Sequence, residues 1–150
     1  MNAPVRPSLS KQRLRVWLRL LRATRFIENE VRESLRTGHD TTLPRFDVLA
    51  MLDRTCEGLR MSELSAQLMV SNGNVTGIVE RLVQDGLVER IAVEGDRRAT
   101  RVRLTAQGRE TFATMAAEHE TWVDGLLSNL DEGDSAELIR LLQRIGKDTA

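Results

Sequence analysis

Residues 62–105 restrict the fold more than any other part of the chain, because they read as helix, turn, helix and hairpin in that order. In the second helical segment, Val75, Ile78, Val79 and Leu82 follow the i, i+3, i+4, i+7 spacing of a buried stripe. The opposite face is small and polar, with many hydrogen-bond donors and acceptors. Such a face suits the floor of a DNA major groove. We therefore predict a helix-turn-helix whose second helix is a recognition helix.

A hairpin is predicted directly after this helix. Residues 87–93 and 99–104 alternate apolar and polar positions, and Gly86 before them is a typical helix-ending glycine. The predicted tip spans 94–98 and carries Arg97 and Arg98. Two adjacent guanidinium groups at a hairpin tip, beside a helix-turn-helix, indicate a wing.

Together these parts carry a family resemblance. Residues 64–108 read LSAQLMVSNGNVTGIVERLVQDGLVERIAVEGDRRATRVRLTAQG. The run GLVER, followed by GDRR and RLTAQG, resembles the winged helix-turn-helix of MarR-family transcriptional regulators. Helical flanks on both sides extend the resemblance over nearly the whole chain. It implies a dimeric regulator that binds double-stranded DNA and blocks promoter access at a pseudo-palindromic operator.

The expected fold is mainly α with a small β wing, in one compact subunit. Residues 1–9 are expected to form a flexible arm, 10–38 a dimerisation helix, 39–104 the winged helix-turn-helix lobe, and 105–150 further dimerisation helices. Single residues predict several helix boundaries. These are Ser10 and Gly38 for the start and end of the first helix, Thr42, Ser62, Ser71 and Thr105 for later starts, and Glu132-Gly133 for a final break.

The terminal helices carry more apolar positions than a small winged-helix core can cover. Unpaired amphipathic helices at both ends favour a partner surface, most simply a second copy of the chain. MarR-like proteins use these helices for dimerisation. We expect a homodimer with recognition helices about 34 Å apart, one turn of duplex.

In the recognition helix, asparagine and threonine side chains are expected to read base edges. Arg81 would reach a phosphate, with Gln84 or Asp85 as alternative partners. Two glycines stand where the family often has bulkier residues, and each costs about 1 kcal/mol of helix stability relative to alanine. A solvated polar surface is the alternative interpretation of this face. The candidate residues are Asn72, Gly73, Asn74, Thr76, Gly77 and Arg81.

At the wing, the resemblance implies that Asp96 orients an arginine while Arg97 or Arg98 enters the minor groove. Which arginine inserts is left open, and a solvated turn is the alternative. Phosphates could also lie against the helix N-termini expected at Ser62 and Ser71, where free N–H groups and the helix dipole favour an anion.

Net charge is zero, but it is unevenly divided. Residues 1–37 hold nine basic and three acidic side chains, whereas residues 104–150 hold four basic and nine acidic ones. An overall basic patch, the usual footprint of nucleic-acid binding, is absent. DNA binding would therefore depend on a few arginines and on helix N-termini. No run of apolar residues is long enough to span a membrane, and no signal core is evident, so we expect a cytoplasmic protein.

Few residues are suited to catalysis or metal binding. His39 and His119 are the only histidines and Cys56 is the only cysteine, and HExxH, CxxC, Walker and GxSxG motifs are missing. We therefore expect no enzymatic activity, no cofactor and no metal. A zinc site from these three residues with a carboxylate is a remote alternative. Cys56 as a redox sensor is another, weighed against an inert small side chain.

The resemblance implies a small-molecule effector, commonly an aromatic acid bound between the dimerisation helices and the DNA-binding lobe. Arginine beside aromatic rings suits an aromatic carboxylate. The basic first helix, with Arg15, Arg19 and Arg22, could instead attract a CoA thioester. The candidate effector residues are Trp17, Arg19, Arg25, Phe26, His39 and Phe46. An alternative function of a different class is a protein-interaction module that binds a partner protein instead of DNA.

Overall fold

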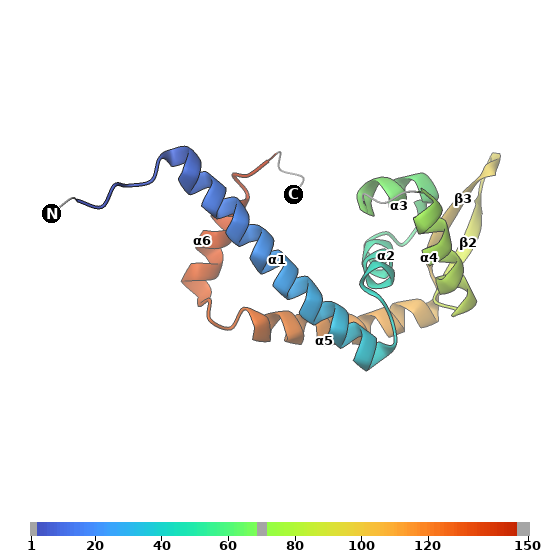
Figure 1. Ribbon diagram of the computed structural model, residues 1–150. Helices are drawn as coiled ribbons and strands as arrows, with labels where there is room; N and C mark the ends of the chain where they lie inside the picture. The colour runs from blue at the N-terminus through green and yellow to red at the C-terminus, as the bar shows by residue number, and fades with distance from the viewer. Residues whose placement is uncertain (1–2, 69–71, 147–150) are drawn as a thin grey trace.

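The computed structural model describes residues 3–68 and 72–146. Its elements are α1 (Leu9–His39), α2 (Leu43–Asp53), β1 (Leu59–Arg60), α3 (Met61–Leu68), α4 (Asn72–Gln84), β2 (Val88–Val93), β3 (Asp96–Leu104), α5 (Ala106–Leu126) and α6 (Glu132–Leu142). Figure 1 shows a lobe of α2, α3, α4 and the sheet at one end, with α6 and the first half of α1 at the other. Helix α5 connects the two ends. The predicted fold class, mainly α with a small β wing, is confirmed.

Helix α1 is longer than predicted at both ends. Ser8, not Ser10, is its N-cap, and the Ser8 side chain accepts a hydrogen bond from the Lys11 amide. Gly38 does not end the helix, because the left-handed residue that terminates it is Asp40, at φ 48°. Aspartate tolerates this conformation better than most residues. His39, placed by the sequence in the DNA-binding lobe, is therefore the last residue of α1.

The hydrophobic core lies in the lobe and its junction with α1 and α5. Side chains from α1, α2, α3, α4, both long strands and α5 contribute to it, and Leu35, Val48, Leu64 and Val102 are fully buried. Within α4, Val75, Val79 and Leu82 are buried and Ile78 is half-buried, as the spacing predicted. No helix among the described residues has the length and apolar character needed to cross a bilayer.

The three strands form one antiparallel sheet in the order β1-β3-β2. Strand β1 has two residues and pairs with β3 at the edge, as expected for a very short segment. Helix α3 begins at Met61, directly after this strand. Val88 faces Leu104 in the β2–β3 ladder, so the apolar face of the hairpin covers the core.

Helix α5 begins as predicted, with Thr105 as its N-cap. The expected break at Glu132-Gly133 is wrong, because α5 ends at Leu126 and both residues lie in the first turn of α6. Asp131 and Asp134 form a reciprocal capping box there, which fixes the start of α6 before the glycine. No residue of α6 is buried in the single chain.

Candidate nucleic-acid interface

Helices α3 and α4 form the helix-turn-helix. The prediction that Ser62 caps α3 is wrong, because the helix already begins at Met61 and Ser62 is its exposed second residue. The Glu63 carboxylate accepts a hydrogen bond from the Arg60 amide at 3.2 Å. Glu63 therefore supplies the return half of a capping box counted from Arg60. Ser71, the second predicted cap, lies outside the described residues.

Helix α4 turns its small and polar side outward. Asn74, Thr76, Gly77 and Arg81 are exposed, opposite the buried valines. Asn72 and Gly73 belong to its first turn. A Cβ atom built on Gly77 would meet nothing within 4 Å, so this position leaves open space on the exposed face. The exposed surface of α4 therefore consists mainly of small and polar residues.

Arg81 makes the alternative contact that the sequence analysis considered. Its Nε atom lies 3.4 Å from the Asp85 carboxylate, one helical turn away, and both side chains are substantially exposed (56% and 42%). An exposed pair of this kind contributes about 0.3–0.5 kcal/mol. Because so little free energy holds the pair, the guanidinium can exchange Asp85 for a phosphate at low cost.

The hairpin is anchored to the helices on both sides. Gly86, at φ 77°, ends α4 as predicted, and the Leu87 amide donates to the Leu82 carbonyl. The Thr105 hydroxyl donates to the Gly86 carbonyl at 2.7 Å and accepts from the Gly108 amide at 2.9 Å. One side chain thus ties the end of α4 to the start of α5.

Gly108 allows α5 to approach the base of the hairpin closely. A Cβ atom on Gly108 would lie 1.9 Å from the Leu87 carbonyl oxygen. Further out, the Arg103 guanidinium donates to the Glu89 carboxylate across the strands at 2.6 Å. The first contact fixes the base of the hairpin against α5, and the second joins its two strands.

The tip of the hairpin is shorter than predicted. The turn consists of Glu94 and Gly95, with Gly95 at φ 83°, and β3 already begins at Asp96. Arg97 and Arg98 therefore lie in the first part of β3 and not in the turn. The register changes there, because Ala92 faces Thr100 whereas Val93 faces Asp96. The two arginines lie in this irregular stretch of backbone.

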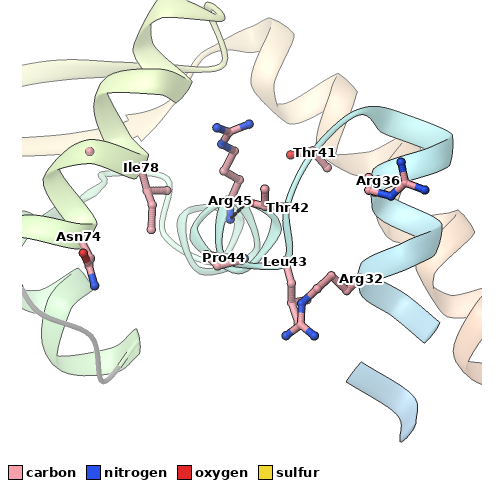
Figure 2. Close-up of a pocket in the computed structure, with 10 residues that line it drawn as sticks. Arg32, Arg36, Thr41, Thr42, Leu43, Pro44, Arg45, Asn74 and Ile78 are labelled. Carbon is pink, nitrogen blue, oxygen red and sulfur yellow. Dashed lines mark hydrogen bonds between the residues drawn. The ribbon is translucent and has the colours of Figure 1, made fainter. Parts of the chain in front are cut away.

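A cleft of about 740 Å³ separates the end of α1 from α4. Figure 2 shows Arg45 of α2 extending between α4 and α1, and Ile78 and Asn74 on the α4 side. The other lining residues are Arg32, Arg36, Thr41, Thr42, Leu43, Pro44 and Gly77. Sequence analysis missed the three arginines of this cleft, because they belong to two helices that the sequence pattern does not bring together.

In the described part of the chain, the six candidate effector residues are spread over several surfaces. Trp17 and Phe26 are 55% and 54% exposed on α1. Arg25 borders a separate hollow of about 190 Å³ with three other α1 residues, and Arg19 is exposed. Phe46 is buried between Phe112 and His119, whereas His39 contacts α5.

Cys56 lies apart from both histidines. It is exposed and borders a small hollow with Asp53 and Arg109. Across residues 3–68 and 72–146, no group of three or more His, Cys, Asp and Glu side chains is arranged to hold a metal ion. The three residues of the remote zinc alternative are thus not gathered into such a group.

The fold and this surface define a winged helix-turn-helix protein. A family model described as MarR family matches residues 39–99. The regulator BilQ of Clostridium symbiosum is 37% identical over 90 residues, which are 60% of this chain and 62% of that relative, less than two thirds of its length. The regulator PecS of Dickeya dadantii is 28% identical over 144 residues, covering 95% and 86% of the two chains.

A solved MarR-family regulator from Silicibacter pomeroyi is also similar. It is 30% identical, with 93% of this chain and 96% of that chain covered and a TM-score of 0.76. The protein belongs to the MarR family of transcriptional regulators.

Proposed function

We propose that the protein is a homodimeric repressor that binds a pseudo-palindromic operator in double-stranded DNA, with α4 in the major groove and the hairpin at the minor groove. The observation that carries this proposal is the pairing of a narrow polar face on α4 with a hairpin fixed beside it through Thr105 and Gly86. A mutant of MarR from E. coli, 25% identical to this chain, has been solved in complex with operator DNA.

Base contacts are assigned to Asn72, Asn74 and Thr76, and close backbone approach to Gly73 and Gly77. Phosphate contacts are assigned to Arg81 and to the helix N-termini near Ser62 and Ser71. The minor-groove contact is assigned to Arg97 or Arg98, with Asp96 orienting the arginine.

A second copy of the chain is the proposed partner of α1 and α6. Both helices expose large apolar side chains: Leu14, Trp17, Leu18 and Phe26 on α1, with Leu138, Ile139, Leu141 and Leu142 on α6. The basic α1 and the acidic C-terminal part of the chain are also complementary in charge. Two copies related by a two-fold axis would cover these surfaces and place two recognition helices on consecutive grooves.

The effector is assigned to the cleft lined by Arg32, Arg36 and Arg45, in place of the cavity expected around Trp17. Its walls also carry Leu43, Pro44 and Ile78, so an apolar body with an anionic group fits it. Arg36 is engaged by Glu33 at 2.6 Å, and an anion would compete for this exposed guanidinium. An aromatic carboxylate or the anionic part of an acyl-CoA has this chemistry. Bound there, it would contact α4 directly and alter DNA affinity.

Fluorescence anisotropy with duplex from the upstream region of its own gene, against a scrambled duplex, tests the DNA proposal. Affinity should favour the upstream duplex and fall steeply with log[salt], because phosphate contacts release counterions. Salt-insensitive behaviour without sequence preference would instead favour a module that docks a partner protein. The effector site is tested by adding aromatic acids or acyl-CoAs to the protein–DNA complex. They should release the DNA from the wild-type protein but not from Arg45→Ala.

The direction of regulation needs its own assay. The relative BadR of Rhodopseudomonas palustris, 35% identical over 77 residues, is named a transcriptional activatory protein. A promoter fusion in cells with and without this chain should show higher expression when the chain is absent. Lower expression would overturn repression while leaving DNA binding in place.

A further inference from the structure

The two histidines of the chain, distant in sequence, both lie beside Trp122 at the junction of α1, α2 and α5. His39 ends α1, and His119 lies in the middle of α5. Both rings lie beside Trp122, with centroid separations of 6.1 Å from His39 and 6.5 Å from His119. This junction is where the first helix passes into the DNA-binding lobe.

His39 links the end of α1 to α5. Its Nε2 atom contacts the Glu118 carboxylate, and its side chain is only 18% exposed. Trp122 also approaches the backbone of α1, since a Cβ atom on Gly38 would lie 4.0 Å from its ring. The contact with Glu118 is an ion pair when the imidazole is protonated and a neutral–charged hydrogen bond when it is not.

His119 links α5 to α2. Its ring stacks on Phe46 at a centroid separation of 4.7 Å. It also interacts electrostatically with Asp47 of α2, whose carboxyl is half-buried and also senses Glu28 of α1. On its open side, His119 borders a hollow with Glu120 and Asp124. Protonated, the imidazole would offset the negative charge of Asp47 on α2 and of the carboxylates beside it on α5.

The charged groups at the junction are therefore mostly carboxylates. They are Glu28 on α1, Asp40 after it, Asp47 on α2, and Glu118, Glu120 and Asp124 on α5. The cation nearest in sequence to His39, Arg36, is paired with Glu33. Protonation of either histidine places a positive charge among carboxylates from different helices, which draws the helices together.

We propose that His39 and His119, with Glu118 and Asp47, form a protonation-dependent clamp that sets the orientation of the DNA-binding lobe relative to α1. The clamp rests on the proposed function, because its consequence is the spacing of two recognition helices. His39 and His119 are positioning residues and touch no DNA. When the histidines are protonated, the clamp holds the DNA-binding lobe in the orientation needed for binding. This lowers the free-energy cost of binding two half-sites. Histidine is the side chain whose charge changes between about pH 5 and 8.

The fluorescence of Trp122 reports the state of the clamp in the absence of DNA. In a Trp17→Phe background, Trp122 is the remaining tryptophan, and protonated imidazole at its ring should quench its fluorescence as pH falls from about 8 to about 5.5, the range over which histidine titrates. Glu118→Gln should weaken this pH response, because the variant removes the carboxylate that the His39 imidazole contacts across the two helices. Glu110→Gln, an exposed carboxylate on the same helix, is the matched control and should leave the pH response as in the wild type. A pH-independent signal, or the same pH response in all variants, would overturn the clamp.

DNA affinity tests the coupling. The wild-type protein should bind the upstream duplex at least about fivefold more tightly at about pH 6 than at about pH 8. The ratio of the DNA affinities at the two pH values should fall towards one in the double variant His39→Gln with His119→Gln. If the double variant does not fold, Glu118→Gln should show the same fall. A pH-independent affinity in the wild type would overturn the coupling. No DNA binding at any pH would refute the proposed function instead, and the clamp would then be decided by the Trp122 titration.

Discussion

Asp47 shows how a single carboxyl at the helix junction affects stability. Burial raises the pKa of the Asp47 carboxyl above its usual range, the charge of His119 opposes this rise, and Glu28 adds to it. The folded chain therefore retains the Asp47 proton to a higher pH than the unfolded chain, whose aspartates titrate near about 3.9. The contribution of this group to stability declines as pH rises through the acidic range.

Asp47→Asn should consequently stabilise the protein at about pH 7, where the wild-type carboxylate is charged. The gain should shrink as pH falls below about 4, where Asp47 becomes protonated in both states. Urea midpoints at neutral and acidic pH measure this difference. Asp53→Asn, at an exposed position of the same helix, is the matched control for the loss of one carboxyl. An equal gain at both pH values would contradict the burial effect.

The close approach of α5 to the hairpin requires a glycine at the position of Gly108. Gly108→Ala places a methyl group 1.9 Å from the Leu87 carbonyl oxygen, and only a shift of backbone can relieve this overlap. We expect a loss of about 3 kcal/mol in the free energy of unfolding. Gly125→Ala, on the same helix with open space around it, should instead stabilise by roughly 0.5–1 kcal/mol. Denaturant unfolding of both variants checks the contrast.

At the scale of elements, helices with one clear apolar stripe could be predicted from sequence. Helix α4 was found because Val75, Val79 and Leu82 recur at helical spacing and are buried. Boundaries were less accurate where two residues compete for one role. Ser8 and Ser10 are both good N-caps, and Asp40 replaces Gly38 as the left-handed terminator.

The candidate site was only partly predictable, for a related physical reason. The polar face of α4 and the hairpin are local in sequence, so their residues could be named. The cleft and the histidine junction each join side chains from separate helices, such as Arg32 with Arg45 and His39 with Glu118. Only the tertiary fold brings these pairs together.

Arg97 and Arg98 of the hairpin are expected to contribute to DNA affinity and little to stability. Arg97→Ala with Arg98→Ala should weaken DNA binding by about tenfold to a hundredfold and reduce the salt dependence, with little change in urea midpoint. The control removes the same charge elsewhere, in Arg54→Ala with Arg109→Ala, two exposed arginines outside the hairpin, α1 and α6. Anisotropy should show a much smaller loss for this control. Equal losses would mean that net charge, and not the hairpin, governs binding.

At the scale of the whole molecule, α6 is the element that depends most on a partner to cover its apolar side chains. Ile139 is 57% exposed, and the helix buries no residue in the single chain. Ile139→Glu should therefore shift sedimentation at micromolar concentration from a dimer towards the 16.9 kDa monomer. DNA affinity should fall with it, because two linked half-sites are lost. Val5→Glu, at a 93% exposed position in the N-terminal arm, should remain dimeric. A wild-type monomer would refute the proposed assembly.

The capping box of α6 has a consequence for the lifetime of the protein in a cell. Asp131 and Asp134 start this helix, yet none of its residues is buried in the single chain, so a newly made subunit would display an amphipathic helix until a second copy arrives. Unassembled subunits would be open to proteases, and assembled ones protected by mass action. The turnover of the regulator would then depend on its own concentration, with scarce subunits degraded faster than abundant ones.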